Sequence, residues 1–131
     1  MIHGGTSTAL ALGTPPGREH RGWPVGIGGL WEGTPKTFHL QNAALSGSGT
    51  EVKGDHIYDP RTGGTASGHM ASWVTHHSAA VADALSTAFM VMSEEEVTGY
   101  CAQNPDVWAL VVTGENKFRI FQDGHVIIIS R

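Results

Sequence analysis

The segment Ser78–Met92 constrains the fold more than any other part of the chain, because its apolar residues recur with the period of an α-helix. One helical stripe carries Val81, Leu85, Ala88 and Met92. Ser78 is expected to cap the start of a helix of about four turns. Asp83 is the only charged residue of the segment. A helix that is apolar almost all round is usually buried on both sides, so this carboxylate is costly unless a cation meets it.

A second helix and several strands complete the expected architecture. Ser93 and Glu96 have the spacing of a capping box, which starts a helix that ends near Asn104–Pro105. Strands are expected at residues 7–12, 23–30, 37–45, 70–76, 107–113, 117–122 and 125–130. Asp123–Gly124 is a strong hairpin signal, and Ser46–Gly49 is interpreted as a flexible turn. The expected fold class is α+β, an antiparallel sheet with two consecutive helices packed on one face.

Length and composition favour a single globular domain over residues 1–131, with 40% hydrophobic residues to form its core. The net charge of −4 and the eight scattered Lys and Arg residues argue against nucleic acid as a partner. The apolar runs are far shorter than the roughly 20 residues of a membrane span, and no signal peptide is visible, so a cytoplasmic protein is expected from the chain as written. Cys101 is the only cysteine and is interpreted as a small buried residue.

Asp83 and Thr87 stand at positions i and i+4 and therefore share one face of the expected helix. A carboxylate and a hydroxyl are suitable ligands for a hard cation such as Mg²⁺. In the alternative interpretation, Asp83 has no ligand and is simply favourable in the N-terminal half of its helix, where the helix dipole stabilises a negative charge. Thr87 then donates a hydrogen bond to a backbone carbonyl of the preceding turn. The spacing by itself favours this alternative, because Asp and Thr pairs at i and i+4 are common and the motif is short.

The segment Asp59–Gly63 also has two interpretations. Its Asp, Pro and Gly residues are typical of a β-turn. However, His56 lies three residues upstream of Asp59 and can accept a proton near neutral pH. The forked guanidinium of Arg61 matches phosphate or carboxylate oxygens. By itself, a segment of this kind is more often a turn than a site.

The eight histidines invite a metal interpretation that their spacing does not support. His76 and His77 are adjacent, so on a strand their side chains would point to opposite faces and could not easily share one ion. The other histidines lack the spacing of zinc ligands. We therefore expect the histidines to be mostly surface or loop residues.

Two motifs in this order resemble the C-terminal signatures of the ApbE family, the FAD:protein FMN transferases. The first motif is residues 56–63, HIYDPRTG, and the second is residues 82–92, ADALSTAFMVM. Weaker similarities lie at residues 2–13 and 23–27. Residues 44–49, ALSGSG, are similar to the serine and glycine segment that lies near the flavin in this family. The resemblance runs from about residue 2 to residue 113 and favours the functional interpretation of both motifs.

The resemblance implies a Mg²⁺-dependent enzyme that splits FAD at its pyrophosphate, transfers FMN to a threonine or serine hydroxyl of an acceptor protein, and releases AMP. It assigns Asp83 and Thr87 as metal ligands and His56 as the catalytic base for the hydroxyl proton. The residues that it assigns to the flavin nucleotide are Ser46, Ser48, Gly49, Asp59, Arg61 and Thr62. Because family members are often exported, the resemblance leaves the compartment open.

The resemblance covers only the C-terminal portion of the family, whose members are usually much longer. The remaining part ordinarily supplies a backbone carbonyl to the metal and much of the adenine and flavin pocket. Three alternatives follow. In the first, the chain is a transferase, active alone or with a second copy or a partner chain that supplies the absent part. In the second, it is a non-catalytic flavin-nucleotide or metal-binding module, or a subunit of a split enzyme. In the third, it is a structural domain in which Asp83 is a buried helix residue.

Overall fold

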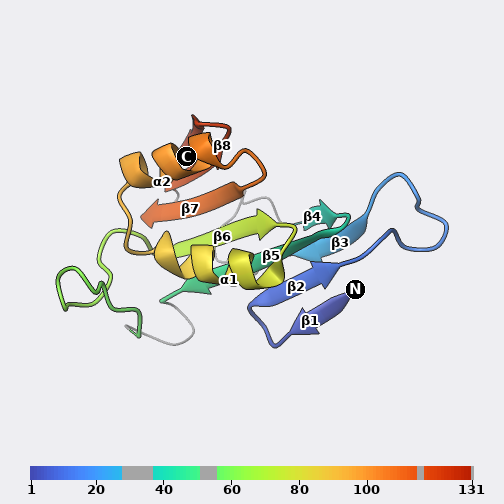
Figure 1. The fold of residues 1–131 in the computed structure, drawn as a ribbon, viewed down its shortest axis with the longest axis horizontal. Coiled ribbons are helices and arrows are strands. Elements are labelled where there is room, and N and C mark those ends of the chain that lie inside the picture. The colour runs from blue at the N-terminus through green and yellow to red at the C-terminus, as the bar shows by residue number, and fades with distance from the viewer. Residues whose placement is uncertain (28–36, 51–55, 115–116, 131) are drawn as a thin grey trace.

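The computed structural model describes residues 1–27, 37–50, 56–114 and 117–130. It has the expected α+β architecture, with a seven-stranded antiparallel sheet in the order β1-β2-β5-β6-β7-β8-β9 and a separate two-stranded sheet of β3 and β4. The strands are β1 (Ile2–Gly4), β2 (Thr8–Ala11), β3 (Trp23–Gly26), β4 (Thr37–Leu40), β5 (Ala43–Gly49), β6 (Ala71–His76), β7 (Trp108–Gly114), β8 (Lys117–Gln122) and β9 (His125–Ser130). The helices are α1 (Ala79–Ala88) and α2 (Glu94–Gln103), which lie on the same face of the large sheet (Figure 1).

Each face of the large sheet has its own buried core. On the helix face, Leu85 from α1, Phe89 at its C-cap, and Val97 and Cys101 from α2 pack against Val74, Val107, Ala109, Val111 and Phe121. On the opposite face, Val25, Ile27 and Leu40 pack with Leu45, Leu110, Val112 and Phe118. Successive residues of a strand point to opposite faces, so β7 is buried on both sides. This double burial is the reason that residues 108–112 form an uninterrupted apolar run.

Both helices begin where the sequence predicts. The Ser78 side chain accepts a hydrogen bond from the Val81 amide, and Ser93 and Glu96 form the expected capping box. The second helix ends at Gln103 with Asn104 as its C-cap, as predicted. The first helix ends at Ala88, four residues before the predicted end, and turns continue the chain to Val91. Among the described residues, neither helix has the length and hydropathy needed to cross a membrane.

The buried face of α1 differs from the predicted stripe. Val81 is 36% exposed, whereas Ala82 and Ser86 are completely buried. The small side chains of Ala82 and Ser86 allow the helix to lie close to β5 and β6, and this close packing turns Val81 towards solvent. A stripe chosen by side-chain size alone therefore misses the true contact face of the helix.

Two strand predictions are corrected by the structure. The predicted strand 37–45 is divided into β4 and β5 by a turn at Asn42, whose φ is +51°. Ser46–Gly49 is not a flexible turn, because these residues continue β5 and pair with β6. Their small side chains fit between neighbours on both sides. A Cβ atom on Gly47 would lie only 2.7 Å from the indole of Trp73.

The other strand predictions agree with the structure. The Asp123–Gly124 hairpin is confirmed, with positive φ angles of 50° and 75° at the two residues. Strands β2, β6, β7, β8 and β9 lie within one or two residues of their predicted bounds. Strand β3 begins at Trp23 as predicted, and residues 28–30 of that prediction lie outside the described residues.

Candidate functional site

Asp83 lies beside hydroxyl groups from two neighbouring strands. Ser46 Oγ on β5 donates a hydrogen bond of 3.0 Å to Asp83 Oδ1. Thr8 Oγ1 on β2 lies 2.8 Å from Ser46 Oγ and 3.4 Å from the same carboxylate oxygen. The hydrogen bonds between the Asp83 carboxylate and other described residues all end on Oδ1. This carboxylate is therefore held by one oxygen, and its other oxygen is left for other partners.

Thr87, one turn further along α1, belongs to a second chain of hydroxyl groups. Its Oγ1 lies 3.1 Å from Ser48 Oγ, which in turn lies 2.9 Å from Ser86 Oγ. Ser86 Oγ donates a hydrogen bond of 2.9 Å to the backbone carbonyl of Asp83. The two chains run side by side along the contact between α1 and the sheet. We call them the hydroxyl seam, which consists of Thr8, Ser46, Ser48, Asp83, Ser86 and Thr87.

The hydroxyl seam contains four of the predicted site residues. Ser46 and Ser48 alternate with Gly47 on β5, so both side chains face α1, as the alternation of a strand requires. Asp83 and Thr87 come from the facing side of α1. Gly49 closes the same strand and lies against Met70 and Ala71 of the neighbouring segment. The two motif segments that carry these residues, 44–49 and 82–92, are thus brought into direct contact.

The expectation that α1 buries Asp83 is wrong. The side chains of Asp83 and Thr87 are both exposed, although the hydroxyl of Ser46 beside them is completely buried. Water reaches the carboxylate, so its charge needs no bound cation to offset a desolvation penalty. The sequence of α1 is apolar almost all round the helix, but only one face of the helix packs on the sheet. Exposure instead leaves the carboxylate and the Thr87 hydroxyl accessible to a ligand.

The donor atoms at the exposed side of the hydroxyl seam are suitable for a hard divalent cation. A carboxylate oxygen of Asp83 and the hydroxyl oxygen of Thr87 are the ligand types that Mg²⁺ prefers, with water and phosphate oxygens completing its octahedral shell. Both side chains are reachable from solvent and lie on one helix face. The residues present therefore fit Mg²⁺.

The segment 56–66 forms the turn that its composition predicts. The amides of Thr62 and Gly63 donate to the Asp59 carbonyl at 3.2 and 2.8 Å, and Gly63 has a φ of +71°. The Asp59 carboxylate accepts a further bond from the Arg61 amide at 2.9 Å. His56 is exposed at the start of this segment, and the next residue, Ile57, is buried and anchors it. Thr62 is exposed at the tip of the turn.

Arg61 ties this turn to both helices. Its guanidinium pairs with Asp59 and with Glu96 of α2, each at 3.0 Å, and also donates to the Val91 carbonyl just after α1. The side-chain hydrogen bond from Arg61 is the main reason that the pKa of Asp59 is lowered. The backbone hydrogen bond from Ser93, followed by the bond from Arg61, lowers the pKa of Glu96. These two carboxylates, Asp59 first, raise the pKa of Arg61.

The position of Arg61 bears on its predicted contact with the flavin nucleotide. In this structure its guanidinium is engaged by the chain itself, so it holds the turn in place. Sequence reasoning missed Glu96 as its partner, because that residue was assigned only to the capping box. The contact of Asp59, Arg61 and Thr62 with a flavin nucleotide stays a prediction.

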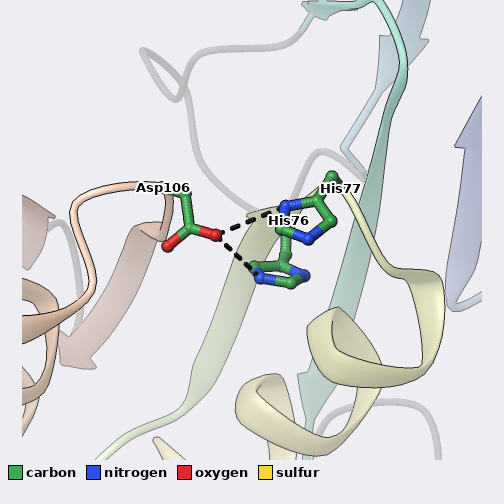
Figure 2. Close-up of side chains that lie close together, drawn as sticks. All are labelled: His76, His77 and Asp106. Carbon is green, nitrogen blue, oxygen red and sulfur yellow. Dashed lines mark ion pairs between the residues drawn. The ribbon is translucent and has the colours of Figure 1, made fainter.

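The interpretation of His76 and His77 as residues on opposite faces is wrong. The two rings lie one against the other, with centroids 3.9 Å apart, and both face the same carboxylate oxygen of Asp106 (Figure 2). Asp106 Oδ2 lies 3.0 Å from His76 Nε2 and 3.3 Å from His77 Nδ1. The alternation of a strand does not apply because β6 ends at His76, and His77 belongs to the turn into α1.

The three ligand-type atoms of His76, His77 and Asp106 lie within 4.8 Å of one another, which is a spacing that a metal ion can bridge. A hydrogen bond next to the cluster opposes this use. The Ser78 amide donates to His76 Nδ1 at 2.9 Å, so a neutral His76 ring carries its proton on Nε2, towards Asp106. A protonated ring nitrogen cannot bind a metal. The cluster is therefore a hydrogen-bond network that joins the end of β6, the cap of α1 and the start of β7.

Comparison with known families identifies the chain. The model of the ApbE family matches residues 1–111, a range that includes the hydroxyl seam and the segment 56–66. The chain belongs to the ApbE family. A search of curated proteins found no match to the chain.

ApbE proteins are, in general, flavin transferases that use FAD as a substrate and a protein as the acceptor. In this ApbE chain, the matched range contains both helices and the strands up to the middle of β7, whereas β8 and β9 lie beyond it. Sequence reasoning missed Thr8 and Ser86 among the residues of the hydroxyl seam. Their only signal is a hydroxyl side chain, and the pairing of β2 with β5 that makes Thr8 relevant is not encoded in any local spacing.

Proposed function

We propose that this chain is a Mg²⁺-dependent FAD:protein FMN transferase, which moves FMN from FAD to a threonine or serine hydroxyl of an acceptor protein. The observation that carries the proposal is the hydroxyl seam. Asp83 and Thr87 of one family motif lie exposed on α1, within hydrogen-bond reach of Ser46 and Ser48 of another. Family membership supports the general activity, and the donor chemistry of Asp83 and Thr87 supports the cation.

The proposed reaction is a phosphoryl-type transfer. The acceptor oxygen forms a bond to the phosphorus on the FMN side of the FAD pyrophosphate, the bond to the bridging oxygen breaks, and AMP leaves with that oxygen. The proton of the acceptor hydroxyl goes to the imidazole of His56, which is exposed. When bound by Asp83 and Thr87, Mg²⁺ would neutralise charge on the pyrophosphate oxygens.

The remaining predicted residues would position the flavin nucleotide. Ser48 offers a partly exposed hydroxyl on the seam, and Gly49 has no side chain to keep a ligand away from the backbone. Ser46 is buried and would act mainly by holding Asp83. Asp59 and Arg61 would keep the turn that carries His56 and Thr62 against the ends of the two helices.

The test is to incubate the purified chain with FAD, Mg²⁺ and a candidate acceptor protein, and to measure AMP release by chromatography. We expect AMP release that disappears with a chelator and in Asp83→Ala. Glu95→Gln, a change of an exposed acid on α2, is the matched control and should retain activity. Intact FAD in the wild-type reaction, with or without the acceptor, would contradict a transferase that acts alone. Tight FAD binding without AMP release would instead indicate a flavin-binding module or a subunit that needs a partner chain.

A further inference from the structure

We propose that Thr8 and Ser86 are positioning residues for the divalent cation, acting through Ser46 and Ser48 on the two ligands Asp83 and Thr87. This inference rests on the proposed function, because it needs a cation at these ligands. Neither Thr8 nor Ser86 is itself an expected ligand of the cation. Each stands at the far end of a hydroxyl chain whose near end is one of the ligands.

Counting protons gives the direction of the first chain. A hydroxyl group donates one hydrogen bond and accepts up to two. The shortest contacts are satisfied when Thr8 donates to Ser46 over 2.8 Å and Ser46 donates to Asp83 Oδ1 over 3.0 Å. The alternative bonds, from Ser46 to the Ser7 carbonyl at 3.3 Å and from Thr8 to Asp83 at 3.4 Å, are longer. Thr8 therefore supplies the proton that keeps Ser46 directed at the carboxylate.

The second chain follows the same rule. Ser86 donates to the Asp83 carbonyl over 2.9 Å, so Ser48 donates to Ser86 over 2.9 Å. Thr87 then donates its single proton to Ser48 over 3.1 Å, because its alternative bond to the Asp83 carbonyl, at 3.4 Å, is longer. The lone pairs of the Thr87 oxygen stay free, which is the state a neutral hydroxyl needs to bind a cation. Ser86 thereby sets which way Thr87 presents its oxygen.

Burial makes both chains rigid enough to orient a ligand. Ser46 and Ser86 are completely buried. If one of their hydroxyl groups is removed, a water molecule can take its place only where the substitution leaves a cavity large enough to hold it. Groups that orient metal ligands typically change metal affinity about 10- to 100-fold when they are removed. The exposed ligands Asp83 and Thr87 would be mobile without these buried supports, and binding would then have to order them.

The test uses Mn²⁺ as a paramagnetic probe for the hard-cation site, measured by electron paramagnetic resonance on the full chain. Thr8→Val keeps the side-chain shape and removes the hydroxyl, and we expect Mn²⁺ to bind about 10-fold more weakly. Thr8→Ser restores the hydroxyl and should bind within about twofold of wild type. Ser86→Ala should weaken binding as Thr8→Val does. Thr98→Val, which removes a hydroxyl bonded to a carbonyl within α2, is the control and should leave binding unchanged.

A second measurement separates positioning from folding. In the transferase assay, Thr8→Val should raise the Mg²⁺ concentration for half-maximal AMP release and leave the rate at saturating Mg²⁺ near that of wild type. A variant that merely unfolds in part would lose rate at every Mg²⁺ concentration. If wild type binds Mn²⁺ and Asp83→Asn does not, but Thr8→Val and Ser86→Ala bind as wild type does, the inference is overturned and the proposed function stands. If wild type itself does not bind Mn²⁺, both are overturned.

Discussion

At the scale of single residues, the molecule buries polar groups where its helices pack on the large sheet. Ser46, Ser72 and Ser86 are completely buried between the large sheet and α1 or α2. Ser46 and Ser86 are hydrogen-bonded, whereas Ser72 Oγ is the buried side-chain atom without a partner among the described residues. A buried hydroxyl stabilises the fold only when it is hydrogen-bonded. The three serines are therefore not equivalent, although the sequence gives no reason to distinguish them.

Replacing these serines by alanine is expected to have opposite effects. Ser46→Ala removes the bond to Asp83 and should lower the free energy of unfolding by about 1 kcal/mol. Ser72→Ala removes an unsatisfied buried hydroxyl and should leave stability unchanged or raise it by about 1 kcal/mol. Urea denaturation of both variants checks this. An equal loss of unfolding free energy in the two variants would show that water or a ligand makes a hydrogen bond to the Ser72 hydroxyl.

At the scale of elements, β5 is a strand because of its neighbours and not because of its own residues. Its sequence from Ser46 to Gly49 consists only of serine and glycine, which are poor strand formers. The strand pairs with β2 on one edge and β6 on the other. Its small residues let α1 approach one face and let the Trp73 indole cover Gly47 on the opposite face. Close approach on both faces therefore requires this composition.

Two glycine substitutions test the close approach. Gly47→Ala would place a Cβ atom 2.7 Å from the Trp73 indole and should lower the free energy of unfolding by about 1–3 kcal/mol. Gly99→Ala on α2 meets no atom within 4 Å and is the matched control. It should raise the free energy of unfolding by about 0.5–1 kcal/mol, because alanine loses less entropy in a helix. Wild-type stability in Gly47→Ala would show that Trp73 moves aside freely.

At the scale of the whole molecule, the large sheet is covered on its two faces by different means. The helices cover one face, the small β3-β4 sheet covers the other, and β7 lies buried between both cores (Figure 1). Asp83 and Thr87 lie at the exposed edge of the contact between α1 and β5, so the candidate site opens to solvent on the helix face. Arg61 joins the segment 56–66 to the ends of α1 and α2 on that same face. The segment that carries the proposed base is thus tied to the end of the helix that carries the proposed metal ligands.

Low pH should lower the free energy of unfolding, partly because the two carboxylates that pair with Arg61 become protonated. The folded-state pKa values of Asp59 and Glu96 are lowered, so the stability that they contribute is present above the ordinary carboxyl pKa of about 4 and is lost as the pH falls through their folded values. Arg61→Gln should be less stable than wild type near neutral pH, and the difference should shrink as the pH falls towards about 3. Urea denaturation across this range measures it, with Arg18→Gln as the exposed control. A difference that is constant with pH would exclude this coupling.

Much of the fold follows from local signals that the sequence carries. The caps at Ser78 and Ser93 and the Asp123–Gly124 turn are determined by residues within four positions of one another, so they are readable without the fold. The motifs at residues 56–63 and 82–92 are likewise contiguous, and they pointed to the ApbE family that the comparison shows. The fold class followed from the order of strand and helix periods.

The tertiary structure alone decided the rest, because it depends on which distant residues become neighbours. The strand character of Ser46–Gly49 and the burial of Ala82 and Ser86 are set by the packing of α1 on β5. The exposure of Asp83 and the stacking of His76 on His77 depend on where elements end and which side they leave open. The sequence by itself determined where the elements start and which chemical groups they carry. Only the pairing of distant strands determined that those groups form one hydrogen-bonded seam, since strand register is fixed by contacts far apart in the chain.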